Sequence, residues 1–468
     1  MLKLNRDKIA AFYQDTEKPH RIEWGILIII SVILFSSYLY WDIIITTRHG
    51  INVWDSLFNG RLFNYYFDNV SPQISRFPTW KAIYPFSVYL VFAIWDFPLW
   101  IMEHVFHKDP FLSTTALMYA KCILIPFLLG SAYMVYKICR ELSISAGNSK
   151  WCVFFFLSSN LVFFPLVVTG QYDIFTVFFM LIGIYYYIKN DDLKFVSFFA
   201  VSISLKLFPL FVFIPLLLLR QKKISKILLM GFMSMSIYLV SSLFFSIPKD
   251  SSDVMYRMIG YLFSHTLPLT YKDVPIFVVV TVCLWIYCYI KNPENDEAPG
   301  RTAIYISFLA IAAIFVCCYT HLYWIILLSP FICILCFTNK KYFKSGFLIE
   351  LMSSAAVIFG LHMGIGYMGM INNAFLPQIF GSIPSDKFDI NFGMYIKELL
   401  NNDVIFDAIS PSCTAAFVAG IIAFAIINFR SEPQTTEEPK INKGIIWFRL
   451  AINAFICVLP VVCYFIEK

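Results

Sequence analysis

The chain has 468 residues, of which 59% are hydrophobic, 18% are aromatic and only 14% are charged, and its mean hydropathy is +0.70. These values exclude an ordinary soluble domain and indicate an integral membrane protein. The formal net charge of +6 does not indicate a nucleic-acid partner, because the basic residues follow the distribution that sets membrane orientation. Membrane lipids are therefore the expected surroundings.

The first apolar segment, Trp24 to Ile45, follows a basic flank and is about as long as a bilayer-spanning helix. It predicts an uncleaved first span, because it is too long for a signal-peptide core and has no small-residue cleavage site. An outer segment, 46–111, is expected next, with a polar loop at its start. Its apolar part, 83–106, is interrupted by two prolines and two acids, so we expect one or two aromatic-rich helices lying in the membrane interface.

Segment 195–219 is apolar, yet both of its flanks carry the basic residues typical of a cytoplasmic side. It is interrupted in the middle by Leu205-Lys206-Leu207-Phe208-Pro209, which predicts two short helices that meet near Lys206. The other spans are expected near 112–136, 151–168, 173–189, 224–247, 274–291, 302–319, 322–337, 344–367, 412–429 and 444–465. The fold class is therefore an all-α polytopic membrane protein, a single membrane domain with about 11 to 13 transmembrane helices.

Charge predicts the orientation. With the N-terminus in the cytoplasm, the inner connections hold 22 Lys and Arg in 82 residues, whereas the outer ones hold 12 in 128. This bias predicts a multi-pass protein of the cell membrane whose loops 248–273 and 368–411 cover a site on the outer face. The twelve cysteines lie almost entirely in apolar segments, so we expect no disulfide framework, and the Cys333/Cys336 pair lacks the partners of a metal site.

Ionisable side chains at membrane depth are costly and are candidates for function. Asp173 follows Thr169-Gly170-Gln171-Tyr172 at the mouth of a predicted helix, Lys206 lies beside the proline break, and His321 lies at the junction of two spans. The sequence therefore places an acid, a base and an imidazole at interruptions of otherwise apolar segments.

In chain order, these features resemble the glycosyltransferases of the GT-C fold that use polyprenyl-phosphate sugars. The aromatic stretch 54–66, Tyr84-Pro85 and the span ending at Tyr136-Lys137 are similar to the start of that fold. Three later motifs continue the resemblance: Gly170-Gln171-Tyr172-Asp173 resembles its Gly-Gln-x-Asp, 205–209 its Leu-Lys-Pro, and His321-Leu322-Tyr323 the His-Glu-Arg-Tyr turn of its bacterial mannosyltransferase-like branch. The resemblance covers 24–337, a GT-C-like catalytic module, and 338–468 adds further transmembrane helices.

The resemblance implies an inverting hexosyltransferase that moves a sugar from a polyprenyl-phosphate monosaccharide to a lipid-linked glycan, a cell-surface polymer or a protein, as in polysaccharide biosynthesis. Such a reaction needs a carboxylate as general base and donor groups around the departing phosphate. No acid occupies the family's usual position, several residues before Trp54, and Asp42 and Asp55 flank that gap. The candidate bases are Asp55 and Asp42, and then Asp173. No cofactor and no metal is expected, because the first outer loop has no Asp-x-Asp pair.

Several residues are candidates for binding the substrate. Arg48, His49 and Arg61 in the outer segment have the chemistry to bind a lipid phosphate, although contact with lipid headgroups explains them as well. The other candidates lie at the interruptions of the spans, namely Gln171, Tyr172, Lys206, His321 and Tyr323.

Three other functions fit the same composition. Broken helices with intramembrane charges are also expected in a transporter or flippase of a lipid-linked saccharide, but the break near Lys206 has no counterpart in the second half of the chain. A polysaccharide polymerase would use the same carrier with an oligosaccharide donor. A noncatalytic scaffold would tolerate the loss of Asp42, Asp55 and Asp173.

Overall fold

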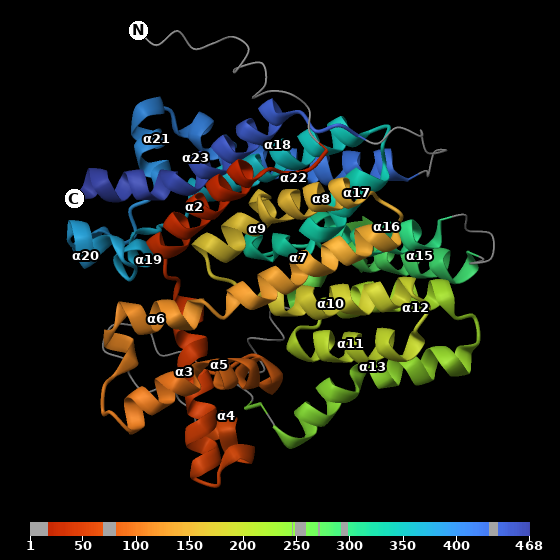
Figure 1. The fold of residues 1–468 in the computed structure, drawn as a ribbon, viewed down its shortest axis with the longest axis horizontal. Coiled ribbons are helices and arrows are strands. Elements are labelled where there is room, and N and C mark those ends of the chain that lie inside the picture. Colours follow the sequence, from red (N-terminus) through yellow and green to blue (C-terminus); the bar gives the residue numbers. More distant parts are fainter. Residues whose placement is uncertain are drawn as a thin grey trace.

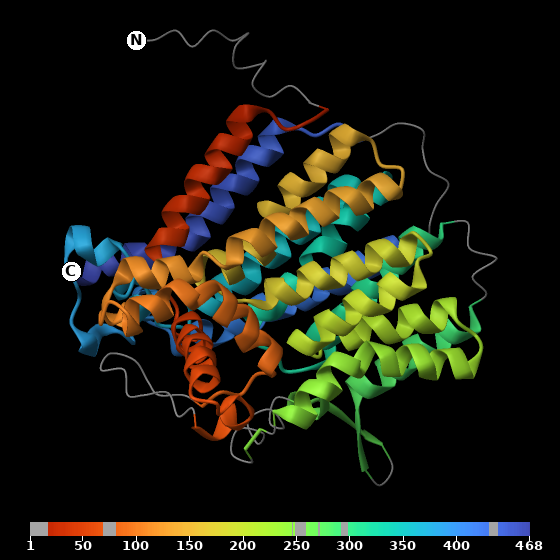
Figure 2. The same cartoon turned by 60° about the horizontal axis from the view of Figure 1, so that its bottom comes forward.

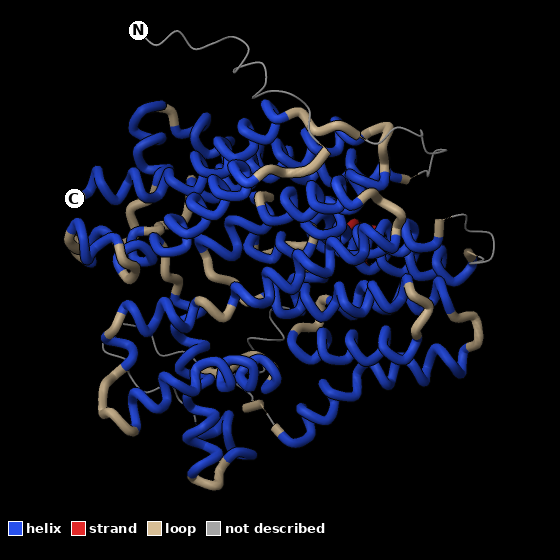
Figure 3. Tube along the Cα trace, viewed as in Figure 1, coloured by secondary structure: helices blue, strands red, loops and turns tan. Residues whose placement is uncertain are grey.

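The computed structural model describes residues 17–68, 81–245, 247–248, 259–269, 272–291, 298–429 and 439–468. These residues are almost entirely helical (Figure 3), which confirms the predicted all-α class. The strands among them form one small antiparallel hairpin, β1 (Thr266–Leu269) and β2 (Lys272–Pro275), in which Thr266 pairs with Pro275.

In the described part of the chain, seven helices are long and apolar enough to cross a membrane, or up to nine if each of two bent pairs counts as one span. Four shorter apolar helices accompany them: α10 (Asp173–Ile188), α12 (Pro209–Arg220), α15 (Ile276–Ile290) and the segment Tyr323–Thr338. The chain is therefore a multi-pass integral membrane protein by helix length and hydropathy. The side of the membrane that each end faces stays a prediction of the charge distribution.

The sequence predicted one straight helix for the first apolar segment, and this prediction is wrong. It forms α2 (Arg21–Ser37) and α3 (Trp41–Phe58), which meet at an angle of 74°. Tyr38 and Tyr40 are extended at the break, and the Leu39 amide bonds to the Met370 carbonyl at 2.9 Å instead of continuing the helix. The expected polar loop from residue 46 is therefore the body of α3.

Helix α3 runs crosswise to the long axes of α10 and α12 (Figures 1 and 2). It packs against α5 (Phe86–His104), where Gly50 lies directly on Phe92 and Ala93. The short elements η1 (Leu62–Asn64) and α4 (Tyr65–Asp68) lie between them in the chain. Helix α5 is one of the seven long apolar helices, so its expected position in the interface stays a prediction.

The next part of the chain contains a second bent pair. The short η2 (Pro110–Leu112), α6 (Thr114–Lys121) and α7 (Leu124–Glu141) lead to α8 (Ala146–Leu157). Helix α9 (Asn160–Phe163) and the π-helical turn η3 (Phe164–Val168) then bend away from α8 by 50°. Pro165 has no N–H to donate within this turn. Gly170 follows with φ of +58°, a conformation that favours glycine, and α10 begins at Asp173.

Segment 195–219 forms two short helices, as predicted: α11 (Asp192–Leu205) and α12, with the break at 206–208. Each helix is shorter than a membrane span, and the two lie side by side as a hairpin (Figure 1). The connections after α7, α10 and α12 all lie at the end of the bundle opposite to the tip of this hairpin. Helix α13 (Ile224–Phe244) follows on the outside of the bundle and is largely exposed.

The last third of the chain packs into the same bundle. Its elements after η4 (Tyr261–Phe263) are α16 (Pro299–Cys317), η6 (Leu322–Leu327), α17 (Ser329–Thr338), α18 (Phe343–His362), α19 (Met368–Asn372), α20 (Leu376–Phe380), η7 (Ser385–Lys387), α21 (Phe392–Leu400), α22 (Asp403–Asn428) and α23 (Lys443–Glu467). Among the described helices, the first and the last, α2 and α23, lie side by side in both views (Figures 1 and 2).

A buried ion pair fastens α23 to the rest of the bundle. Arg449 of α23 is fully buried and donates hydrogen bonds to both carboxylate oxygens of Glu350 in α18. It also donates to the Ser158 hydroxyl at 3.0 Å and to the Phe155 carbonyl at 2.9 Å. Ser159 donates to the same carboxylate. The pair is therefore satisfied on both sides, as a buried charge requires.

Candidate functional site

Two chain breaks bring two acids together. The bend between α2 and α3 places Asp42 in the first turn of α3, and the turn after η3 places Gln171 and Asp173 at the start of α10. The amide of Gln171 donates a hydrogen bond to Asp42 Oδ2 at 3.0 Å. Asp42 is only partly buried, whereas the Asp173 side chain is fully buried. Asp42 and Asp173, 131 positions apart in the sequence, therefore belong to one site.

Lys206 provides the positive charge of this site. It lies at the tip of the α11–α12 hairpin and donates a hydrogen bond to Asp173 Oδ1. The ammonium also lies 5.3 Å from the centre of the Trp324 ring and 5.5 Å from that of Phe208, distances typical of cation–π contacts. Lys206 and Asp173 both interact electrostatically with Asp42.

The segment between α16 and η6 forms one side of the site. His321 stacks on Tyr323 with 5.1 Å between ring centres. The rings of His321 and Trp324 meet edge to face, with the same distance between their centres. Burial, and then the positive charge of Lys206, lower the pKa of His321. Its imidazole is therefore neutral at pH 7, with one nitrogen that donates and one that accepts.

Tyrosines cover the acids from the side of α5. Tyr172 is buried and Tyr84 is half-buried, and the two rings meet edge to face with 5.3 Å between their centres. Burial, followed by the negative charge of Asp42, raises the pKa of Tyr84 well above its usual value. Tyr84 therefore keeps its hydroxyl proton, which is able to serve as a hydrogen-bond donor near the two carboxylates.

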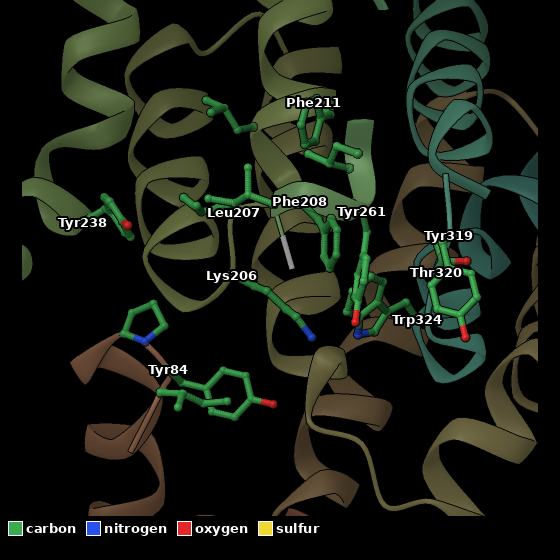
Figure 4. A pocket seen from close by; sticks show the side chains of 15 residues that line it. Tyr84, Lys206, Leu207, Phe208, Phe211, Tyr238, Tyr261, Tyr319, Thr320 and Trp324 are labelled. Carbon is green, nitrogen blue, oxygen red and sulfur yellow. The ribbon is translucent and has the colours of Figure 1, made fainter. Parts of the chain in front are cut away.

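An apolar cavity of about 290 Å³ opens beside Lys206. Its walls are mainly hydrophobic and come from the tip of the hairpin, from α13, and from the segments around Tyr84 and Tyr261. Figure 4 shows the ammonium of Lys206 pointing into the space between Tyr84 and Trp324. The cavity therefore combines an apolar wall with a single cation at one end.

A second cavity, of about 760 Å³, lies on the other side of residues 319–323. Tyr319 and Thr320 line both cavities, whereas His321 and Tyr323 line the second cavity. Its walls carry many more polar side chains, among them Tyr40, Thr169, His265, Asp407, Ser410 and Thr414. Helices α18 and α22 form its far wall, so the last third of the chain contributes to the site region.

The structure does not bring every predicted site residue to this place. Asp55 is thirteen positions after Asp42 on α3, about 20 Å along a straight helix, where it accepts a hydrogen bond from Trp100 and pairs with His104 at 3.0 Å. Arg48 forms an ion pair with Glu103 at 2.7 Å and lies over the ring of Phe111.

His49 and Arg61 also lie elsewhere. His49 is 2% exposed and packs edge to face on Tyr89, inside the α3–α5 interface. Arg61 precedes η1, beyond the far end of α3. The sequence-predicted residues that the structure gathers are Asp42, Gln171, Tyr172, Asp173, Lys206, His321 and Tyr323.

Trp324 and Tyr40 are among the residues of the site that were not predicted from the sequence. Trp324 forms a wall behind Lys206, and Tyr40 faces the polar cavity next to the bend. Both belong to aromatic clusters that are usual at membrane interfaces, so residue type alone did not distinguish them. Within the described residues, no group of three His, Cys, Asp or Glu side chains is placed to hold a metal ion.

A comparison with models of known protein families finds none that matches this chain. A comparison with curated protein sequences also finds no match. The resemblance to the GT-C fold glycosyltransferases therefore remains a prediction from the short motifs quoted above.

Proposed function

We propose that this protein is a membrane glycosyltransferase that transfers a sugar from a polyprenyl-phosphate monosaccharide to a hydroxyl group of a lipid-linked glycan, a cell-surface polymer or a protein on the outer membrane face. The observation that carries the proposal is the pair of the buried Asp173 and the partly buried Lys206, with Asp42 beside it, at the meeting point of three helix interruptions. Ionisable groups are costly in this environment and persist mainly where function requires them.

The apolar cavity fits the donor. An isoprenoid chain needs a hydrophobic wall, which Leu207, Leu210 and Phe211 provide, and its phosphate needs a cation at the end of that wall. Lys206 has that position. One of its three N–H groups bonds to Asp173, so the remaining donors are able to bind phosphate oxygens. Negative charge builds up on this phosphate as the sugar leaves, and a fixed cation stabilises it.

Asp42 fits the role of the general base better than the other two acids. Its carboxylate is partly accessible, with Oδ2 held by Gln171, whereas Asp173 is committed to Lys206 and Asp55 to Trp100 and His104. The acceptor hydroxyl gives its proton to Asp42 and forms a bond to the anomeric carbon of the sugar. The bond from that carbon to the phosphate oxygen breaks with its electron pair, and polyprenyl phosphate leaves. A single displacement of this kind inverts the anomeric centre.

The polar cavity is suited to the acceptor, because hydroxyl-rich ligands need many hydrogen-bond partners. Tyr40 and Thr169 are near neighbours in sequence of Asp42 and Gln171, and both line this cavity. An acceptor bound there would lie next to the chain segments that carry Asp42 and Gln171. Two cavities of different polarity that share one wall are the arrangement that a two-substrate transfer needs.

The test measures transfer of radiolabelled sugar from a panel of polyprenyl-phosphate monosaccharides by the purified protein in liposomes. Asp42→Asn is expected to lower the rate by about 10³-fold, the middle of the range for loss of a general base. Asp55→Asn decides between the acids on α3 and is expected to stay active. Asp191→Asn, an exposed helix cap far from the site, is the matched control.

Transfer that Asp55→Asn abolishes and Asp42→Asn spares would contradict the choice of base. No donor consumption by a folded protein, together with movement of the lipid-linked sugar between leaflets, would indicate a flippase instead. Transfer of oligosaccharide but not of monosaccharide donors would indicate a polymerase. If neither transfer nor movement occurs, a scaffold is the remaining function. Each assay is repeated with a chelator, because metal dependence is an independent question.

A further inference from the structure

Lys121 is a buried lysine that the proposed reaction does not use. It is the last residue of α6, its side chain is fully buried, and its ammonium lies over the ring of Phe35 at 4.2 Å. Within the described residues, no carboxylate lies within ion-pair distance of it. A buried charge without a counter-ion must be stabilised by hydrogen bonds.

Those hydrogen bonds go to main-chain carbonyl groups at the two chain breaks. Lys121 Nζ donates to the Phe35 carbonyl at 2.8 Å and to the Tyr38 carbonyl at 2.6 Å, at the C-terminal end of α2. It donates to the Val167 carbonyl at 2.8 Å, near the end of η3. Three acceptors require three N–H groups, which only the charged ammonium has. A helix C-terminus also favours a nearby cation.

Lys121 joins the end of α2 to the end of η3. Asp42 follows the first of these ends in the chain, and Gln171 follows the second. Asp42 is four residues beyond Tyr38, and Gln171 is four residues beyond Val167. Between them, a Cβ added at Gly170 would lie 3.6 Å from Lys121 Cε and 4.0 Å from Ile43 Cβ, so this turn packs directly on the lysine and on α3. The hydrogen bond from Gln171 to Asp42 spans the junction.

We propose that Lys121 is a positioning residue: its three carbonyl contacts fix the α2 end against the η3 end, and so hold Gln171 on Asp42 in the geometry that catalysis uses. The inference rests on the proposed function, because the role of Asp42 comes from it. Lys121 itself contacts main-chain carbonyls and lines neither of the two cavities described above.

The experiment compares Lys121→Met with Gln171→Leu in the transferase assay and by hydrogen exchange of the full-length protein in liposomes. Lys121→Met is expected to lower kcat about ten-fold and to leave KM for the donor within about two-fold. It is expected to displace the pH profile in the same direction as Gln171→Leu, and the double variant should be no slower than the slower single variant. The amides of 38–42 and 167–173 are expected to exchange about ten-fold faster in Lys121→Met.

Arg449→Met is the control, because it removes another buried cation, one that bonds to Glu350, Ser158 and Phe155 and to none of the carbonyl groups that Lys121 binds. It is expected to lower stability but to leave kcat per folded molecule unchanged. If Lys121→Met does not accumulate, Lys121→Gln keeps an amide donor and is measured in the same way.

The inference is overturned if Lys121→Met keeps both the wild-type kcat and the wild-type exchange at the two segments, or if the lower kcat comes without a displaced pH profile. If the wild type transfers no sugar, the proposed function fails. Hydrogen exchange then still decides whether Lys121 holds the two segments together, so the two failures are distinguishable.

Discussion

Removing both partners of the Asp173–Lys206 pair should destabilise the protein far less than the sum of the two single removals. Lys206→Met would leave the fully buried carboxylate of Asp173 without its cation. Breaking a buried pair in this way costs about 3–5 kcal/mol. Because Asp173 lies at the N-terminus of α10, the helix dipole offsets about 1 kcal/mol. We therefore expect a loss of about 3 kcal/mol, at the lower end of the range for a broken buried pair.

Asp173→Leu instead leaves the ammonium of Lys206 without its carboxylate partner. Lys206 keeps 14% of its side chain exposed and lies near the rings of Trp324 and Phe208, contacts that offset about 1 kcal/mol. The expected loss is about 2 kcal/mol. The double variant replaces the pair by apolar side chains and should lose about 2 kcal/mol in all, a coupling energy of about 3 kcal/mol.

The assay is reversible unfolding of the four proteins in mixed micelles of sodium dodecyl sulfate and a mild detergent, analysed as a double-mutant cycle. The matched control is the exposed pair of Lys194 and Asp191 at 2.9 Å, for which no measurable coupling is expected because water screens it. Additive losses at Asp173 and Lys206 would refute the reasoning, since additivity means that the two charges do not interact. All three variants should lack transferase activity even where the double variant is stable.

Two further predictions use groups outside this pair. Because burial lowers the pKa of His321, the unfolded state binds a proton at this residue first as pH falls. The free energy of unfolding should therefore decrease below about pH 6.5. His321→Gln should flatten this part of the stability–pH curve, and an unchanged slope would contradict the prediction. Glu350→Gln should destabilise the protein by about 3 kcal/mol by leaving buried Arg449 without its counter-ion. Transfer per folded molecule should stay at the wild-type rate, whereas a change in KM would link this pair to substrate binding.

The break at Lys206 was predictable because its causes are local. A lysine and a proline lie three positions apart in an apolar segment with basic flanks on both sides, and no straight span satisfies all of these features. The ordered series of apolar segments was predictable for the same reason, since hydropathy over about 20 residues determines the helices.

The bend at Tyr38 was not predictable, because no proline or glycine marks it and its causes lie far away in the sequence. The carbonyl of Tyr38 is taken by Lys121 and the amide of Leu39 by the Met370 carbonyl. Without this bend, Asp42 and Asp55 seemed to lie in the same outer region. Because both acids belong to α3, Asp42 lies near its start and Asp55 near its end, and only Asp42 reaches Gln171.

The arms of the α11–α12 hairpin, of 14 and 12 residues, are each about 20 Å long and do not span a hydrocarbon core of about 30 Å. During biosynthesis, the ammonium of Lys206 must therefore enter the apolar phase at the tip of a loop that returns to the side it came from. Its partner Asp173 is 33 residues earlier in the chain, so the growing protein has already made the helix that neutralises this charge. Because α10 precedes the hairpin in the chain, we expect α10 to insert first and to provide the carboxylate with which Lys206 of the hairpin then pairs.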